Sequence, residues 1–384
     1  MLALLPVMAL VLLAFLVIGL GLPVLPLHVH DGLGFGPFTV GLVAGSQFAA
    51  AVVSRIWAGS HADRRGARRG IVLGLLFAAG GGLCYLLSLA PGAAPAVAVA
   101  VLVVARLLLG AAESFVITSG ISWGFGLLGG DQSGRVIAWV GMAMFAAMAL
   151  GAPLGTVLYD HGGFMAVAVA TLVVPLAALP AVLRLPAPPP AGSGARPEVL
   201  RLARLVWLPG TGCALASVGF GAILAFGSLL YAGRGWSPVW LPFTAYAAGL
   251  IGARILFGHL PDRLGGARVA LVTLLVEAAG LALMGLATGP AMAGLGAALT
   301  GVGYALVYPG LGREAVLRTP PESRGVVTGI YTAFLDVAMG LGGPLLGLVG
   351  SHAGLGAVFL ASAVAVLGAL AVVLRLLARP VAAA

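Results

Sequence analysis

Residues 55–66 read RIWAGSHADRRG, and residues 254–265 read RILFGHLPDRLG. Both segments begin with Arg-Ile, have Gly at the fifth position and end with Asp-Arg, one further residue and Gly. The matched positions are 199 residues apart. A second pattern consists of Pro153, His161 and Gly163. It occurs again 191 residues later, at Pro344, His352 and Gly354. Chance is a poor explanation for two such registers, so the sequence predicts a chain of two related halves.

The composition places both halves in a lipid bilayer. Of the 384 residues, 61% are hydrophobic and only 8% are charged, with a mean hydropathy of +1.13. An average soluble domain has about a quarter of its residues charged, which excludes a soluble fold. All 20 basic residues are arginine. Without lysine, the chain has neither the phosphate-binding residue of a P-loop nor the nucleophile of a Schiff-base enzyme.

Twelve apolar segments are long enough to cross a membrane, because a transmembrane helix needs about 20 apolar residues. We therefore predict an all-α membrane protein with twelve transmembrane helices in two pseudo-symmetric six-helix bundles. The predicted helices cover residues 3–27, 37–60, 70–90, 96–122, 136–158, 163–184, 205–231, 238–260, 269–288, 291–316, 325–349 and 354–376.

The arginines are distributed unevenly over the loops between these helices. Fifteen lie in alternate loops or at the C-terminal end, whereas the opposite loops contain only Arg234. Positively charged residues accumulate on the cytoplasmic side of membrane proteins, so we expect both termini in the cytoplasm of a bacterial inner membrane. The net charge of +9 then reports orientation and not a nucleic-acid site. The fifteen are Arg64, Arg65, Arg68, Arg69, Arg135, Arg184, Arg196, Arg201, Arg204, Arg263, Arg268, Arg318, Arg324, Arg375 and Arg379.

The longest hydrophilic segment, residues 185–203, lies between the sixth and seventh predicted helices. It begins with LPAPPP, which favours a stiff extended chain, and continues with AGSG, which is flexible. We predict a cytoplasmic linker here, between an N-terminal six-helix bundle at 1–184 and a C-terminal one at 204–384. Duplicated halves with a site near the middle of the membrane are typical of secondary transporters.

The loop after the second predicted helix, GSHADRRGARR at residues 59–69, resembles the signature loop of the major facilitator superfamily. Over its full length the chain also resembles the bacterial YhhS/YfcJ group of efflux permeases. The two resemblances imply the major facilitator fold and export of a solute, without naming a substrate. The shared stretches include Val24-Leu25-Pro26, Gln47-Phe48-Ala49, Ser114-Phe115, Trp123-Gly124 and Gly343-Pro344.

The resemblance to the superfamily also implies a role for this loop in gating. In the family, the loop braces the cytoplasmic side of one half against the other when the carrier opens outward. Glycines in such a loop permit close approach and a tight turn. The residues that match are Gly59, Asp63, Arg64, Gly66 and Arg69, with Asp262 and Arg263 in the second copy.

Three ionisable residues deep in the predicted helices are candidates for the transport pathway, since a charge within a membrane is costly and needs a reason. Arg106 and Glu113 are seven residues apart, so they share one helix face about 10 Å apart along the axis. Asp336 lies about 16 Å into its helix, near the bilayer centre. By resemblance all three face the pathway, and Arg106 is similar to an arginine tied to proton movement in proton-coupled drug exporters. Structural ion pairs are the alternative for each.

Glu113 departs from the YhhS pattern, which has a neutral amide there, and this difference favours a role in substrate selection. Gln47 and the aromatic residues Tyr304 and Tyr308 complete the predicted pathway, with simple packing as the alternative for the two tyrosines. The other charges in the helices are predicted to hold helices together. Arg254 and Glu277 lie at similar depths and are expected to pair, and Arg55 is expected to pair with Asp336.

His28, His30 and Asp31 cluster at the outer end of the first predicted helix. Imidazole and carboxylate groups suit several metal ions. Three such residues without a fourth ligand are more typical of a polar helix mouth, so we predict no metal site and no cofactor.

A secondary transporter explains the repeat, the linker, the loop and the charges within the helices together. A polytopic membrane enzyme acting on a lipid is the alternative of another class, but the six histidines are scattered and no HExxH or GxSxG motif is present. No ATP-binding signature is present either, so an ion gradient is expected to drive transport. We predict a monomeric, proton-coupled exporter of a small metabolite or drug-like solute that works by alternating access. An importer or a uniporter of a small polar solute remains the alternative.

Overall fold

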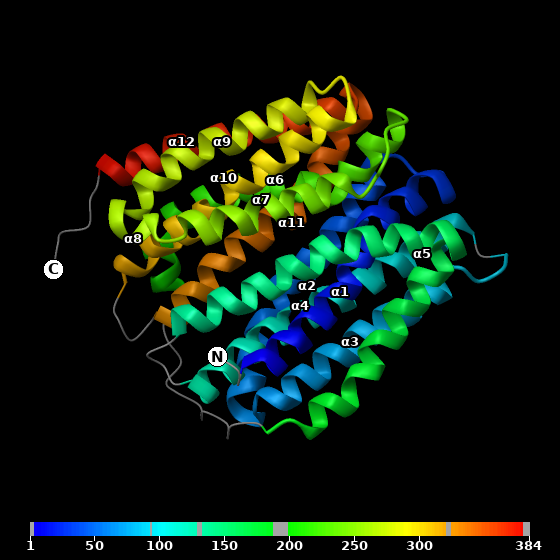
Figure 1. The fold of residues 1–384 in the computed structure, drawn as a ribbon, viewed down its shortest axis with the longest axis horizontal. Helices are drawn as coiled ribbons and strands as arrows, with labels where there is room; N and C mark the ends of the chain where they lie inside the picture. The colour runs from blue at the N-terminus through cyan, green and yellow to red at the C-terminus, as the bar shows by residue number, and fades with distance from the viewer. Residues whose placement is uncertain (1–3, 93, 129–132, 187–198, 320–323, 379–384) are drawn as a thin grey trace. The chain divides into compact units, whose positions relative to one another are not determined.

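The computed structural model describes residues 4–92, 94–128, 133–186, 199–319 and 324–378, and all regular structure within these ranges is helical (Figure 1). Most of the predicted linker at 185–203 lies outside the described residues. The elements are α1 (Leu5–Leu27), the π-helical turn η2 (His28–Gly32), α2 (Pro37–Arg65), α3 (Ala67–Leu87), α4 (Pro95–Leu128), α5 (Ser133–Arg184), α6 (Val199–Gly233), α7 (Leu241–Phe257), α8 (Leu260–Leu264), α9 (Gly266–Gly285), α10 (Pro290–Leu317), α11 (Arg324–Ala353) and α12 (Leu355–Ala378).

Ten of these helices are long and apolar enough to cross a membrane. One of them, α5, has non-helical backbone angles at Gly162 and Gly163 and therefore provides two spans, which Figure 1 shows meeting at a sharp bend. The apolar helix α7 adds another span, although it has only 17 residues. The described residues thus contain the twelve membrane-spanning segments that the sequence predicts, and the all-α membrane fold is confirmed.

The repeated sequence patterns have matching backbone conformations. Gly66, which ends the first copy, has φ 88° and ψ 151°, and Gly265, which ends the second, has φ 91° and ψ 139°. Each of these glycines directly precedes a helix, α3 or α9. Gly163 and Gly354 of the other repeated pattern also have positive φ angles, 61° and 82°. Because glycine adopts such angles without strain, the repeated glycines mark equivalent turns in the two halves.

Gly66→Ala is expected to lower the free energy of unfolding by about 1–3 kcal/mol, because its backbone angles are strained for any residue with a Cβ atom. Gly59→Ala is the matched control, since Gly59 has no positive φ and a Cβ atom there would meet no described atom within 4 Å. The gating role predicted for Gly59 stays a prediction. Thermal unfolding of the purified protein should occur at a lower temperature for Gly66→Ala alone. An equal shift in both variants would contradict this explanation.

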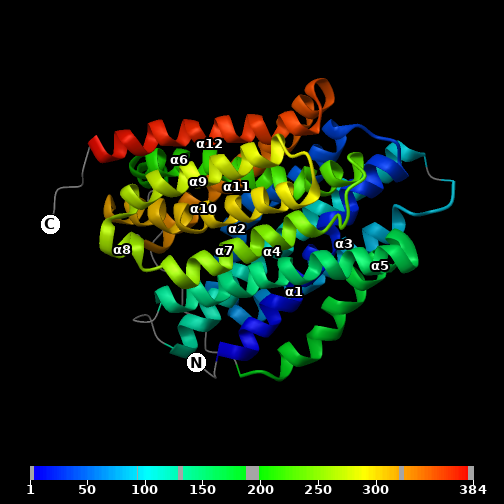
Figure 2. The same ribbon diagram turned by 45° about the horizontal axis from the view of Figure 1, so that its top comes forward.

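Contacts between helices divide the chain into two compact units. The first unit comprises residues 1–35 and 46–194, and the second comprises residues 36–45 and 195–384. Within the first unit, α5 packs on α1 and α3, and α4 packs on α3. Within the second unit, α10 lies between α7 and α9, as Figures 1 and 2 both show, and α6 packs on α11 and α12.

Glycines bring the backbones of α9 and α10 close together. A Cβ atom at Gly280 would lie 2.5 Å from the backbone nitrogen of Thr300, and one at Gly303 would lie 2.5 Å from the backbone nitrogen of Glu277. Small residues allow helices in membranes to approach in this way. The contact fixes the backbone of Glu277 directly against α10.

Candidate functional site

Gln47 and Glu113 form a hydrogen-bonded pair in the first unit. Gln47 on α2 is 2% exposed, and its Nε2 donates a hydrogen bond of 2.8 Å to Oε2 of Glu113 on α4. The two helix backbones touch here, because a Cβ atom at Gly110 would collide with the carbonyl oxygen of Gln47. A second hydrogen bond joins the same two helices. Ser114 Oγ on α4 donates it, at 3.0 Å, to the carbonyl oxygen of Ala51, which lies one turn after Gln47 on α2. The structure thus brings two of the predicted pathway residues into direct contact.

Arg106 lies two helical turns before Glu113 on α4. Its side chain is 3% exposed, and its Nε and Nη1 atoms form no hydrogen bond with the described residues. Gln47 Oε1 is likewise a buried acceptor without a hydrogen bond in the described structure. Buried charge without hydrogen bonds is costly, and a guanidinium group binds carboxylates and phosphates through paired hydrogen bonds. We refer to Gln47, Arg106 and Glu113 as the α2–α4 cluster, which contains hydrogen-bond donors, an amide oxygen and a carboxylate.

Aromatic residues surround a second polar cluster, in the second unit. Tyr304 on α10 and Ser217 on α6 are joined by a hydrogen bond of 2.9 Å between their hydroxyl oxygens. The ring of Phe220 stacks on Tyr246 and Tyr304, with centroid separations of 5.0 and 5.8 Å. Tyr308, one turn further along α10, is half-buried and bonds a threonine hydroxyl of α11 at 2.8 Å. Tyr304 is therefore part of a packed helix interface, whereas Tyr308 keeps some exposed surface.

Sequence reasoning did not single out Ser217 or Tyr246. Ser217 follows Cys213 by four residues and precedes Phe220 by three, so all three lie along one face of α6. This spacing places Ser217 among other residues of one helix face, and it could have been used to predict Ser217 as part of the polar cluster. Tyr246 gives no such signal, because an isolated tyrosine in an apolar helix is ordinary.

The predicted ion pair between Arg254 and Glu277 is not formed. Glu277 on α9 is fully buried, and neither carboxyl oxygen has a hydrogen-bond partner among the described residues. Arg254 on α7 donates from Nε to the carbonyl oxygen of Ala305 on α10, at 3.3 Å. The prediction was wrong because α10 lies between α7 and α9, so equal depth does not bring the two side chains together. Asp336 on α11 is 1% exposed, and its pairing with Arg55 stays a prediction.

The signature loop after α2 holds the chain that follows α5. Arg68 Nη2 donates a hydrogen bond of 2.6 Å to the carbonyl oxygen of Leu185, and Trp123 Nε1 donates one of 3.1 Å to that of Pro186. Both bonds lie within the first unit. The predicted gating residues flank this point, at the end of α2 and the start of α3, and their gating role stays a prediction.

The second copy of the loop is attached to the end of α10. Glu314 Oε1 accepts a hydrogen bond of 3.3 Å from the backbone nitrogen of Ala267 at the start of α9, where the helix dipole favours a carboxylate. Glu314 also forms an ion pair with Arg318 one turn further on. Asp262 lies 3.7 Å from Nε of Arg313, but it is 82% exposed, and such surface pairs contribute little to stability. The carboxylate of Glu314 is therefore the principal polar attachment.

The two histidines of the predicted outer mouth contact α5 and the segment that follows η2. The ring of His28 stacks on Phe164 with a centroid separation of 4.1 Å, and His30 Nδ1 lies 2.7 Å from the carbonyl oxygen of Phe35. Asp31 follows in the same turn. In the part of the chain that the structure describes, no three His, Cys, Asp or Glu side chains are grouped so as to hold a metal ion. The place of His28, His30 and Asp31 at an outer mouth stays a prediction.

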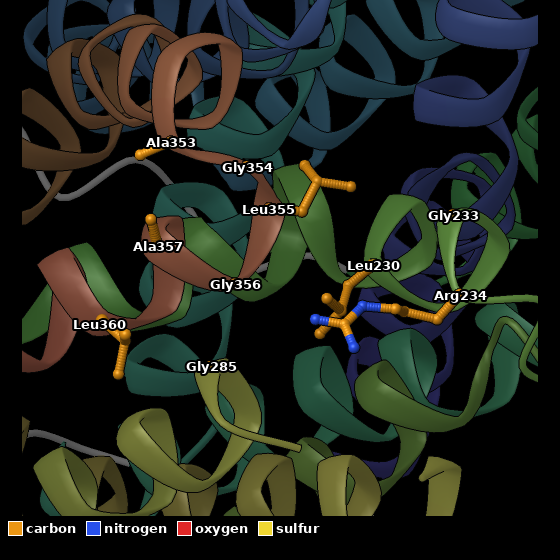
Figure 3. Close-up of a pocket in the computed structure, with 10 residues that line it drawn as sticks. All are labelled: Leu230, Gly233, Arg234, Gly285, Ala353, Gly354, Leu355, Gly356, Ala357 and Leu360. Carbon is orange, nitrogen blue, oxygen red and sulfur yellow. The ribbon is translucent and has the colours of Figure 1, made fainter. Parts of the chain in front are cut away.

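A cavity of about 430 Å³ lies in the second unit, at the end of α9 that is distant from the repeated loop (Figure 3). The last turn of α6, the end of α9 and the connection between α11 and α12 surround it. Figure 3 shows the guanidinium group of Arg234 beside Leu230, and backbone at Gly285 and Gly356 completes the lining. None of the predicted pathway residues lines this cavity, so it is separate from both polar clusters.

Comparison with known families gives a match along almost the whole chain. The model of the Major Facilitator Superfamily matches residues 7–253 and 240–384. STM4428 of Salmonella typhimurium (strain LT2), described as an uncharacterized MFS-type transporter, is 42% identical over 365 residues, which are 94% of this chain and 93% of the relative. YhhS of Escherichia coli (strain K12), described in the same words, is 41% identical over 369 residues, 96% of this chain and 90% of the relative. The resemblance to YhhS is confirmed.

Solved structures of other transporters share the fold. The nucleoside transporter NupG aligns with a TM-score of 0.76 at 14% identity, over 98% of this chain and 99% of NupG. The human organic anion transporter MFSD10 (TETRAN) aligns with a TM-score of 0.70 at 18% identity, over 97% of this chain and 98% of that protein. At such identities the likeness shows the fold alone. Together with the sequence matches, the twelve spans and the repeated signature loop, it shows that the chain belongs to the major facilitator superfamily of membrane transporters.

Proposed function

We propose that this protein is a proton-coupled exporter that moves a small metabolite or drug-like solute across the bacterial inner membrane by alternating access. The observation that carries this proposal is the α2–α4 cluster. It combines a buried arginine whose Nε and Nη1 form no hydrogen bond in the described structure with a carboxyl group that accepts a hydrogen bond from a buried amide. A fixed positive charge and a group that can bind a proton thus lie on one helix.

The spacing within the cluster suggests what kind of solute it binds. Arg106 and Glu113 are separated by about 10 Å along α4. An anionic group of the solute would accept hydrogen bonds from Arg106, and a donor or cationic group would bind Glu113. Protonation of Glu113 would remove the second of these interactions. The proton and the solute would thus compete for Glu113. Because a ligand shifts a conformational equilibrium only through different affinities for the two states, this competition would couple proton binding to solute release.

The distribution of arginines supports the proposed location and orientation. Fifteen of 20 arginines lie in alternate loops or at the C-terminal end, which favours cytoplasmic termini. The absence of lysine supports an ion gradient as the energy source, because a P-loop requires that residue. We propose a monomer as the working unit, since each half supplies its own polar cluster.

Proton movement in liposomes tests the proposal. The purified protein is reconstituted with a pH-sensitive dye inside, and nucleosides, organic anions and zwitterionic metabolites are added one at a time. We expect at least one solute to cause proton movement in the direction opposite to its own. Movement in the same direction would identify a symporter and thus an importer. Solute uptake without any proton movement would identify a uniporter and contradict the proposed coupling.

A further inference from the structure

Glu277 on α9 is packed against α10 at the base of its side chain and against α6 at its carboxyl group. The backbone of α10 touches the base of the side chain, because a Cβ atom at Gly303 would lie 2.6 Å from Glu277 Cβ. The backbone of α6 lies at its other end, where a Cβ atom at Gly219 would lie 3.2 Å from Glu277 Oε1. The side chain is 0% exposed. Gly303 therefore leaves space for the base of the Glu277 side chain, and Gly219 leaves space for its carboxyl group.

The groups around this carboxyl group are polar but almost all uncharged. Cys213 on α6, Tyr304 on α10 and Tyr246 on α7 are close enough to interact with it electrostatically. The Tyr246 hydroxyl, like both oxygens of Glu277, is buried and has no hydrogen-bond partner among the described residues. Asp336 on α11 is also close enough to Cys213 to interact with it electrostatically, and an ionised Asp336 would have a charge of the same sign as an ionised Glu277. None of these four residues can serve as a counterion for Glu277.

The nearby cation does not compensate Glu277 either. Arg254 lies near Tyr246 but donates to the carbonyl oxygen of Ala305, and Glu277 has no ion pair in the described structure. An ionised carboxylate without a hydrogen bond or a counterion costs several kcal/mol inside a membrane protein, so the group neutralises instead. A proton is the one ligand that removes this charge without needing further space. A metal ion would need more ligand groups than the cluster contains.

We propose that Glu277 is a proton-binding site of the second unit, which holds its proton while α6 and α10 close over it and releases it when these helices separate. The hydrogen bond between Ser217 and Tyr304 joins α6 to α10 beside the carboxyl group, so the separation that admits water also breaks this bond. The inference deepens the proposed function and rests on it for its purpose. It adds a proton site on α9, distinct from Glu113 on α4.

Infrared spectroscopy of the protein in lipid tests the site without any substrate. A protonated carboxyl group has a C=O band that a carboxylate lacks, and the band shifts in D₂O. At neutral pH we expect the wild-type spectrum to contain such a band that is lost in Glu277→Gln. The band should move, and not vanish, in Glu277→Asp. Asp160→Asn, which changes an exposed carboxyl group of α5, should leave it unchanged.

The outcomes separate this inference from the proposed function. If neither substitution at Glu277 alters the band region, Glu277 is ionised and the inference is overturned. Glu277→Gln is nearly isosteric with the neutral acid and should fold, and Glu277→Asp gives a second spectrum if it does not. If the band is present but solute transport moves no protons, Glu277 binds a proton and the proposed coupling is rejected. Coupled transport without the band would reject the site on α9 alone.

Discussion

Glu113→Gln is expected to reduce solute-driven proton movement to the level of liposomes without protein. The amide has nearly the shape of the carboxyl group and can still accept the hydrogen bond from Gln47 Nε2, so the contact between α2 and α4 should persist. It cannot exchange a proton or carry the negative charge. The loss should therefore appear in proton movement recorded with the internal dye, while the temperature of thermal unfolding stays close to that of the wild type.

Two further variants show whether the effect belongs to this carboxyl group. Asp160→Asn removes an exposed carboxyl group from α5 and should leave proton movement unchanged. Asp336→Asn removes a buried one from α11, and we expect it to impair coupling as well, in line with its predicted place in the pathway. Wild-type proton movement in Glu113→Gln would show that the α2–α4 cluster only holds helices together.

Gly303→Val is expected to prevent stable folding of the second unit. Even the first atom of the new side chain would lie 2.5 Å from the backbone nitrogen of Glu277 and 2.6 Å from the carbonyl oxygen of Thr273. Overpacking typically costs about 1–3 kcal/mol, and the cost here should be at the upper end because a backbone cannot rotate out of the way. We expect a large loss of folded, detergent-soluble protein, measured by size-exclusion chromatography after purification.

Gly252→Val is the matched control for this substitution. Gly252 lies in α7, and a Cβ atom there would meet no described atom within 4 Å. The change in helix propensity is the same, so the two variants differ in packing alone. A similar yield of folded protein for both variants would contradict the close contact between α9 and α10.

The twelve spans could be predicted because each is a run of apolar residues long enough to cross a membrane, and such runs can be counted in the sequence. The repeat could be predicted as well, since the glycines at 66 and 265 are needed for one turn that occurs twice. The order in which the helices pack could not be predicted from the sequence. Arg254 and Glu277 are expected at similar depths from their positions in the sequence, but such an expectation does not reveal that α10 lies between their helices.

The candidate site was predictable as a set of residues and not as a set of contacts. Glu113 and Arg106 attract attention because charges are rare within membranes. Gln47 donates its hydrogen bond to Glu113 only because α2 and α4 are rotated suitably about their axes. Gly110, which has no side chain, allows the backbone of α2 to come close enough in that orientation. Ser217 and Tyr304 likewise become partners only when α6 and α10 are packed together.

The most direct test of proton-coupled transport is net solute movement under opposing gradients. Liposomes containing the protein are given one fixed solute gradient and a series of imposed pH gradients, with the membrane potential clamped by an ionophore. We predict that net solute movement slows, stops and then reverses as the pH gradient is made to oppose it, and that Glu113→Gln removes this dependence. Solute movement in the wild type that is the same at every pH gradient would contradict the account.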